Sequence, residues 1–350
     1  MKIIHTADLH LGSKISSRFP GEISELLKSE LRAAFMSLIE YAKSTRASVI
    51  ILSGDVFDSD RPFKKDTDFF YKAVESCPEI DFLYLRGNHD TDGERRELPN
   101  LKTFDTGWRS YRYGDVTIWG IEADGRNRES LYSTLAPEAD GINIVMLHGQ
   151  ISSSGEDSVD LIRLADKNID YLALGHIHSH SSGRLDRRGV YAYPGCLFGR
   201  GFDECGAHGF IELTVEGGRL SSEFVTLSGG RIEERVLELS GVTDLYEVYE
   251  RAKALGLSRE KIYRIILTGE VDGELGSIAG DLGARIADFC LYAEIKDRTE
   301  RKIDCKKYEN ELSLAGELVR LVKAADYSEE EKRRILAYGL RALSGKEIEE

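Results

Sequence analysis

The chain has 350 residues, of which 41% are hydrophobic and 31% charged, and a net charge of -14. A chain of this length can bury a large core and is expected to hold more than one domain. The acidic balance argues against the broad, non-specific nucleic-acid binding of basic proteins, although a nuclease with bound cations and a local basic patch is still allowed.

Short apolar runs alternate with helical patterns over the first two-thirds of the chain. Strands are predicted at 2–7, 48–54, 81–85, 116–121, 142–147 and 170–175. Residues 23–43 carry apolar side chains at helical spacing and predict an amphipathic helix; a second helix is expected around 159–166. After residue 180 short strands follow, at 190–193, 208–215 and 221–227. This order predicts a layered α/β sandwich.

The pattern changes near residue 230. Strands at 232–239, 261–268 and 289–296 alternate with helices at 243–256 and 275–288, which predicts a small β-α-β-α-β unit. Two helices are expected to close the chain, the last one introduced by the capping box SEEE at 328–331. We therefore expect a large α/β domain over 1–229, a small α+β domain over 230–300, and C-terminal helices over 301–350.

Polar residues follow five of the predicted strands at their carboxyl ends. They are Asp8-Leu9-His10, Gly54-Asp55, Gly87-Asn88-His89-Asp90, His148-Gly149 and Gly175-His176-Ile177-His178. Open α/β sheets bind ligands outside the carboxyl ends of their strands. We therefore expect these side chains to meet in one site.

The residue types in this set indicate metal chemistry. Imidazoles mixed with carboxylates suit Mn, Fe or Zn better than Mg or Ca, which prefer oxygen ligands. Seven such groups are too many for one ion and suit two, about 3.5–4 Å apart with a shared carboxylate. Each motif alone is more often structural, but five in succession at strand ends favour a two-metal site.

Other features favour a cytoplasmic protein without a membrane partner. No apolar run approaches the roughly 20 residues of a membrane-spanning helix, and the polar start MKIIHTADLH does not resemble a signal peptide. The five cysteines are scattered and form no C-x-x-C pair, as expected for free thiols in a reducing compartment. Cys205 and His208 have zinc-like spacing but no second pair nearby. His5, inside the first strand, is expected to be a core histidine.

The order D-x-H, G-D, G-N-H-D, H-G, G-H-x-H resembles that of the calcineurin-like metallophosphoesterase superfamily. More narrowly, ADLHLGS, GDVFDSDRP, RGNHD, LALGHIH and YPGCLFGRGFDECG resemble the bacterial SbcD-type DNA exonucleases and their YhaO-like relatives. The resemblance implies a four-layer αββα sandwich with a small C-terminal α+β capping domain.

The resemblance also implies a role for each position that matches a family motif. Asp8, His10 and His178 would hold one divalent ion. Asn88, His148 and His176 would hold the other, and Asp55 would bridge the two. The ions are expected to be Mn²⁺, with a hydroxide between them as the attacking group.

His89, beside Asn88, would contact the phosphate and protonate the leaving oxygen; alternatively, it only orders the turn with Asp90. Asp58 stands where archaeal and eukaryotic relatives carry a histidine. Asp58 and Asp90 are expected to support the ligands from behind.

The function implied is that of a two-metal phosphodiesterase, a DNA repair nuclease with 3′–5′ double-strand exonuclease and single-strand endonuclease activity. An alternative is a phosphodiesterase for small nucleotides or other small phosphoesters, which the acidic balance fits better. A scaffold protein with a degenerate metal site is disfavoured, because every ligand position is filled. Phosphate contacts are expected from Lys14, Arg18, Arg95 and Arg96, although each could equally be an ordinary solvated charge.

The resemblance implies partners as well. Relatives form homodimers through helices near the active-site domain and bind an SbcC-type ATPase through C-terminal helices. In this chain, residues 23–43 and the helix after SEEE could serve these contacts, or could pack on their own domain.

Overall fold

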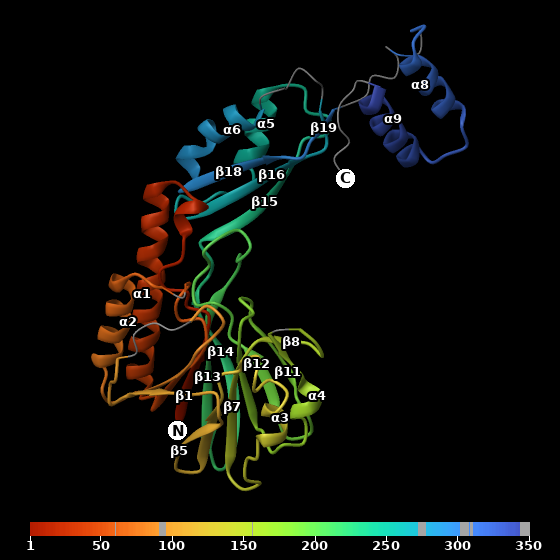
Figure 1. The fold of residues 1–350 in the computed structure, drawn as a ribbon. Helices are drawn as coiled ribbons and strands as arrows, with labels where there is room; N and C mark the ends of the chain where they lie inside the picture. The colour runs from red at the N-terminus through yellow and green to blue at the C-terminus, as the bar shows by residue number, and fades with distance from the viewer. Residues whose placement is uncertain are drawn as a thin grey trace. The chain divides into compact units, whose positions relative to one another are not determined.

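The computed structural model describes residues 1–59, 61–90, 96–155, 157–271, 278–301, 308 and 311–343. The chain divides into two compact units (Figure 1). The first comprises residues 1–234 with 260–262, and the second comprises residues 235–259 with 263–350.

The first unit contains two six-stranded sheets. One has the order β14 (Arg219–Ser228), β13 (His208–Glu216), β1 (Lys2–Thr6), β2 (Val49–Ser53), β3 (Asp81–Leu85) and β4 (Leu101–Thr103). Strands β1 to β4 are parallel, and β13 pairs antiparallel with both β1 and β14. Nearly every residue of β1, β2 and β3 is buried, as expected for parallel strands covered on both faces.

The other sheet has the order β11 (Ser181–Arg184), β12 (Val190–Tyr193), β10 (Tyr171–Gly175), β7 (Ile142–His148), β6 (Val116–Gly120) and β5 (Arg109–Tyr113). Its four central strands are parallel, and the edge strands β5 and β11 are antiparallel to their neighbours. The parallel order brings the carboxyl ends of β7 and β10 to one edge.

The two sheets pack face to face and share one core. Ile3, Val49 and Leu83 come from the first sheet and Ile144 and Met146 from the second, all fully buried. Burial of apolar side chains of this kind contributes about 1.5–3 kcal/mol each.

Helices cover the outer faces (Figure 1): α1 (Gly21–Thr45) and α2 (Lys64–Glu75) on the first sheet, and α3 (Leu131–Thr134) and α4 (Leu161–Leu164) on the second. This arrangement confirms the predicted four-layer αββα sandwich.

Several elements differ from the pattern-based expectation, and among them the short α3, β4 and β11 were not predicted. The helix expected over 159–166 is only the four-residue α4, because Asp160 caps its start through the N–H groups of Ile162 and Arg163, and Asp166 takes the left-handed φ of 59° just after it. Helix α2 and the edge strand β5 were not predicted. Both elements do carry a period, since α2 buries Phe70, Ala73 and Val74 at helical spacing and Tyr111 and Tyr113 of β5 alternate with exposed residues, but each period is short.

The second unit is built on the three-stranded sheet β15 (Ile232–Glu238), β16 (Ile262–Thr268) and β18 (Tyr292–Asp297). The first residues of β15 and β16 are counted with the first unit. Helices α5 (Leu245–Lys253) and α6 (Ile278–Ile286) cover one face of it (Figure 1). A separate core forms there from apolar side chains of the strands and helices, among them Leu239, Val248, Ile265 and Ile286.

Two C-terminal helices, α8 (Leu314–Ala324) and α9 (Glu329–Leu343), pack on one another through Val319, Val322 and Leu336. The predicted capping box is confirmed at the start of α9. The Ser328 N–H donates to Glu331 Oε2 at 2.8 Å, and the Glu331 N–H donates to Ser328 Oγ at 3.2 Å.

The remaining short elements are η1 (Ile15–Ser17), η2 (Ala287–Phe289), β8 (Gln150–Ile151) paired with β9 (Ser158–Val159), and β17 (Glu270–Val271) paired with β19 (Glu300–Arg301). Across the described ranges, every helix is too short or too polar to cross a membrane.

Candidate metal centre

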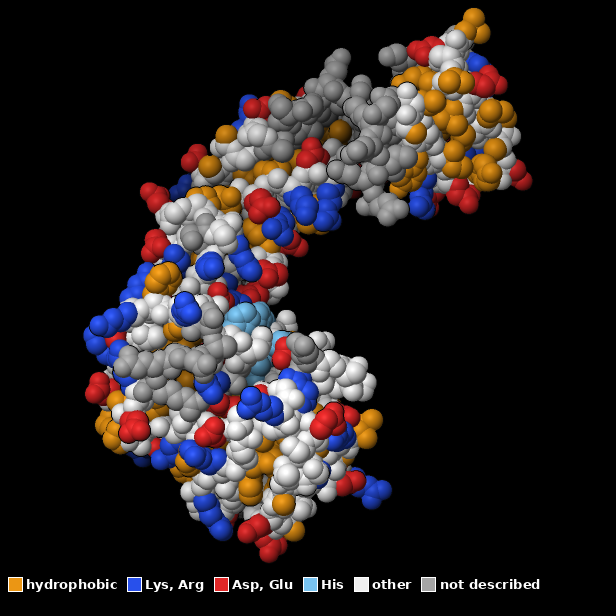
Figure 2. Space-filling view, viewed as in Figure 1, with side chains coloured by type: hydrophobic (Ala, Val, Ile, Leu, Met, Phe, Trp, Pro, Cys, Tyr) orange, Lys and Arg blue, Asp and Glu red, His pale blue; other side chains and the backbone are white. Residues whose placement is uncertain are grey.

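The carboxyl ends of five parallel strands from both sheets deliver the predicted polar residues to one place. Asp8 and His10 follow β1, Asp55 follows β2, and Asn88 follows β3 on the first sheet. On the second sheet, His148 ends β7, and His176 and His178 follow β10. The histidine side chains are visible together on the surface of the first unit in Figure 2.

Two groups of side chains lie close enough to hold metal ions. Asp8, His10 and His178 form one group, and the ligand atoms of its members lie within 4.8 Å of one another. Asp55, His148 and His176 form the other group under the same limit.

Asn88 and Asp55 complete this arrangement. Asn88 Oδ1 lies 2.9 Å from His148 Nε2 and 3.4 Å from His176 Nδ1, so its amide joins the second group. Asp55 Oδ2 lies 3.3 Å from His148 Nε2 and 3.8 Å from His10 Nε2. This carboxylate therefore stands between the two groups, as a bridging ligand would.

The backbone is strained where it presents these side chains. Asp8, His10 and Asp55 have φ values of 53°, 46° and 52°, and His176 has a φ of 101°. Each such conformation in a residue other than glycine costs about 1–3 kcal/mol and persists only where the surrounding structure enforces it. Four strained residues among the predicted ligands indicate a site built for function rather than for stability.

Two glycines allow the strand ends to approach one another this closely. A Cβ on Gly54, which has a φ of 93°, would lie 2.1 Å from His148 Nδ1. A Cβ on Gly87 would lie 2.2 Å from Asp55 Oδ1. The glycines that follow β2 and β3 are therefore required by the site geometry.

Burial shifts the ionisation of the site. Desolvation raises the pKa of Asp8 to about 6 and lowers the pKa of His10 to about 4. Burial also opposes charge on His148 and Asp55, but their mutual hydrogen bond and opposite charges raise the pKa of His148 to about 9 and hold that of Asp55 below its usual range.

The donor set fits divalent cations. His10 Nε2 and His178 Nε2 lie only 3.1 Å apart and face one another, although an imidazole nitrogen without a proton can only accept. Buried carboxylates and facing lone pairs are unfavourable unless a cation or proton lies among them. Nitrogen and carboxylate ligands in two adjoining groups suit a pair of transition ions.

Each of three imidazoles is oriented by an oxygen behind it. His148 Nδ1 lies 2.9 Å from the Ser53 carbonyl oxygen. His10 Nδ1 lies 3.0 Å from Asp58 Oδ1, and His178 Nδ1 lies 2.8 Å from Glu204 Oε1. A proton held at Nδ1 by such a partner leaves the Nε2 lone pair for a metal.

Arg200 and Glu204 are the functional residues that sequence reasoning missed in this role. The Arg200 N–H and Nε donate to Glu204 Oε2 at 2.8 and 3.1 Å, and its Nη1 donates to Asp58 Oδ1 at 3.1 Å. One buried guanidinium thus joins the two carboxylates behind His10 and His178. The only sequence signal was the i, i+4 spacing of Arg and Glu in GRGFDE.

His89 and Asp90 are placed differently. The His89 ring is exposed, its centroid lies 5.3 Å from that of the His10 ring, and its main-chain N–H donates to Asp55 Oδ1 at 2.9 Å. The buried Asp90 carboxylate accepts from the N–H groups of Val56, Phe57 and Gly87 at 2.8–3.1 Å. Asp90 therefore ties the ends of β2 and β3 together.

Three of the candidate phosphate contacts lie in the segments that follow β1 and β3. Lys14 is exposed, Arg18 pairs with Asp203 at 2.9 Å, and Arg96 pairs with Asp68 and covers the Tyr71 ring. Arg95 lies outside the described residues.

The remaining histidines and the candidate zinc pair have local partners. His5 is buried and lies 2.9 Å from the Tyr171 hydroxyl, as a core histidine would. Cys205 Sγ donates to the Phe202 carbonyl, whereas His208 Nε2 lies 3.0 Å from the Glu204 carbonyl oxygen, so each has a separate partner.

The sequence is similar to a known family and to two curated proteins. A model described as calcineurin-like phosphoesterase matches residues 1–180. The uncharacterized metallophosphoesterase YhaO of Bacillus subtilis (strain 168) is 29% identical over 284 residues, which cover 71% of this chain and 67% of that protein. The DNA double-strand break repair protein Mre11 of Methanopyrus kandleri is 24% identical over 367 aligned positions, which cover 93% of this chain and 77% of that protein.

Solved structures are more distant. A dimetal phosphatase from Danio rerio aligns with a TM-score of 0.43 and 9% identity, over 65% of this chain and 97% of that chain.

Proposed function

The chain belongs to the calcineurin-like phosphoesterase family and is a metal-dependent phosphoesterase, and from this premise we propose that it is a DNA nuclease. The proposed activity is hydrolysis of DNA phosphodiester bonds, as a 3′–5′ double-strand exonuclease and single-strand endonuclease that uses two Mn²⁺ ions. The matches to YhaO and Mre11 confirm the family resemblance noted in the sequence.

The observation that carries the proposal is the convergence of five strand ends on two adjoining ligand groups. Asp8, His10 and His178 would hold one ion, and Asn88, His148 and His176 the other. Asp55, between the groups, would contact both. Ions held there would supply a water of lowered pKa and positive charge beside the phosphate oxygens.

His89 would supply a proton donor, which the two ligand groups do not include. Its main chain is fixed by Asp55, while its ring is exposed beside His10. A ring so placed can contact the phosphate and protonate the leaving oxygen. Asn88, the preceding residue, would position the same phosphate through its exposed amide.

Mre11 is named as a protein of DNA double-strand break repair, and similarity to it over 93% of this chain favours DNA as the substrate. Lys14, Arg18 and Arg96 lie in segments that follow β1 and β3 and are proposed to contact DNA phosphates. Such contacts make binding steeply salt-dependent. The acidic net charge favours the second candidate, hydrolysis of small nucleotides or other small phosphoesters.

The deciding experiment incubates the full chain and Mn²⁺ with a 3′-labelled DNA duplex, a single-stranded circle and bis-p-nitrophenyl phosphate. The Asp55→Asn variant serves as the control for contaminating nucleases. DNA cleavage that is lost in the control supports the nuclease. Hydrolysis of the small ester with both DNAs intact supports the second candidate.

Partner binding is proposed from the apolar surface of the C-terminal helices. Hydrophobic side chains gather over α8 and α9 in Figure 2, and Leu314, Leu321 and Tyr338 are among the exposed ones. We propose that this surface binds an SbcC-type ATPase and that the chain forms a homodimer. Light scattering of the full chain tests the dimer, and co-purification with a co-expressed ATPase, compared with a Leu314→Asp and Leu321→Asp variant, tests the surface.

A further inference from the structure

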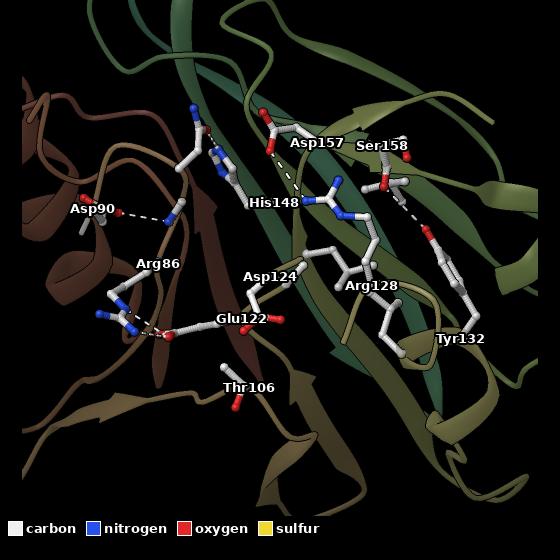
Figure 3. Close-up of a pocket in the computed structure, with 16 residues that line it drawn as sticks. Arg86, Asp90, Thr106, Glu122, Asp124, Arg128, Tyr132, His148, Asp157 and Ser158 are labelled. Carbon is white, nitrogen blue, oxygen red and sulfur yellow. Dashed lines mark hydrogen bonds and ion pairs between the residues drawn. The ribbon is translucent and has the colours of Figure 1, made fainter. Parts of the chain in front are cut away.

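A cavity of about 270 Å³ opens beside the metal centre, and Asn88 and His148 form part of its lining. Figure 3 shows Arg86 and Glu122 on one side of this cavity and Arg128 on the other. A group bound in the cavity would therefore touch two side chains that we place around one ion. The cavity adjoins the place where the scissile phosphate would bind.

The charges that line the cavity do not favour binding of a phosphate group in addition to the scissile phosphate. Arg86 is neutralised by Glu122, whose Oε2 accepts from its Nε at 2.9 Å and its Nη2 at 2.5 Å. Arg128 lies 3.9 Å from the Asp157 carboxylate, and Asp124 adds a further half-buried carboxylate. Because carboxylates outnumber guanidinium groups in the lining, a phosphate would be repelled.

The inner part of the cavity is apolar and rigid. Leu131, Leu147 and Val159 line it and are buried. The buried Tyr132 is held by its hydroxyl, which accepts from the Asp160 N–H at 3.0 Å and donates to the Ser158 carbonyl at 3.4 Å. Apolar walls with a few placed donors and acceptors are typical of sites for small, neutral ring systems.

We propose that this cavity receives the nucleoside attached to the scissile phosphate. Its volume of about 270 Å³ lies just below the roughly 300–1,000 Å³ of small-molecule sites, and suits one nucleoside and not two. The inference rests on the proposed phosphodiesterase function and names the neutral half of its substrate. The nucleoside could come from the end of a DNA strand or from a free nucleotide ester.

Two substrates with the same leaving group test this inference with the Mn²⁺-loaded full chain. They are thymidine 5′-(p-nitrophenyl phosphate) and methyl p-nitrophenyl phosphate, and the measured quantity is the ratio of their kcat/KM values. Ala123 and Thr106 are exposed residues of the lining, so Ala123→Trp and Thr106→Trp should fill the cavity without burying a misfit in the core. We expect each variant to lower the ratio by about 10-fold or more, while hydrolysis of the methyl ester is unchanged.

Ala139→Trp is the matched control, because Ala139 is exposed in the same unit and is not part of the lining. It should leave the ratio at its wild-type value. A ratio that also stays at the wild-type value in both filling variants overturns the proposal.

Calorimetric titration with thymidine gives a readout independent of hydrolysis. Binding to the wild type that is lost in both filling variants supports the cavity even if neither ester is cleaved, in which case only the phosphodiesterase function fails. Absent binding, or binding that persists in both variants, contradicts the cavity even if both esters are cleaved.

A 3′-labelled duplex separates the two sources of the nucleoside. Slower duplex degradation in the filling variants assigns the cavity to the terminal nucleoside of a strand. An effect confined to the thymidine ester assigns it to free nucleotides, and either result is a form of the proposal.

Discussion

The two halves of the metal centre are supported in different ways. The half with Asp8, His10 and His178 is backed by a buried network in which Arg200 joins the carboxylates of Asp58 and Glu204. The half with Asp55, His148 and His176 relies on a backbone carbonyl behind His148 and on the exposed amide of Asn88. The second half also borders the cavity.

This difference in support suggests different roles for the two halves: the first holds its ion, and the second contacts the substrate. A network of buried charges keeps two imidazoles in one orientation, since breaking it leaves uncompensated charge in a desolvated place. An exposed amide beside a cavity can instead adapt to a substrate. We therefore expect the first half to determine how tightly an ion is retained, and the second half to influence substrate preference.

The largest effect is expected from the residue that the two halves share. Asp55→Asn should lower turnover of any phosphodiester by roughly 10³-fold. The reason is that both ions would be lost, and with them the positive charge that stabilises the transition state. Metal analysis after desalting should show loss of both ions. Retention of both ions with normal turnover would place the bridging role elsewhere.

A smaller loss is expected when both halves stay intact and only proton transfer is removed. His89→Ala should keep both ions and lower the kcat for DNA by about 10²-fold, at the lower end of what general-acid catalysis contributes. The loss should be much smaller for a p-nitrophenyl ester, because p-nitrophenolate leaves without protonation. Loss of an ion in this variant would instead make His89 a ligand.

A substitution that affects the support of only one half tests whether the two ions are held independently. Glu204→Gln removes the acceptor charge that orients His178 and should weaken the binding of one Mn²⁺ by about 10–100-fold, leaving the other unchanged. Calorimetric titration of the metal-free chain measures both affinities. Asp203→Asn, at the adjacent exposed carboxylate, is the matched control; equal weakening of both ions in Glu204→Gln would contradict the division.

The smallest effect is expected at His5, the histidine that lies in the core and not in the metal centre, and it concerns the pH dependence of stability. Burial lowers the pKa of His5 to about 3 from its ordinary value of 6.5. Between these values the unfolded chain binds the proton and the folded chain does not, so stability falls as pH falls through the unfolded pKa. Between pH 6 and pH 5 the wild type should lose roughly 1 kcal/mol more unfolding free energy than His5→Asn, which cannot titrate.

Urea unfolding in EDTA measures this difference without the contribution of metal binding. An identical pH dependence for the two proteins would mean that folding leaves the pKa of His5 unchanged. Tyr171 stays in place in both, because its hydroxyl can hydrogen-bond to either side chain.

Much of the fold and of the candidate site could be predicted because the signals are local. An apolar run followed directly by Asp, Asn or His predicts both a strand and the edge at which its polar residue emerges. This is true of β1, β2, β3 and β10, whose ends match the predicted ones within a residue or two. Helix α4 was overestimated since its capping Asp160 and the left-handed Asp166 are visible only in the folded backbone.

By itself, the sequence determined the sandwich, the strand ends and the residue types available to metals, since each depends on the period of a short segment. Only the tertiary structure decided what stands behind and beside those residues. Arg200 meets Asp58 across 142 residues of sequence, and Arg86 meets Glu122 across 36, with no local pattern linking the partners. Such pairs, and the cavity beside Asn88, arise where two sheets bring separate loops together, and the spacing of residues along one chain does not encode that juxtaposition.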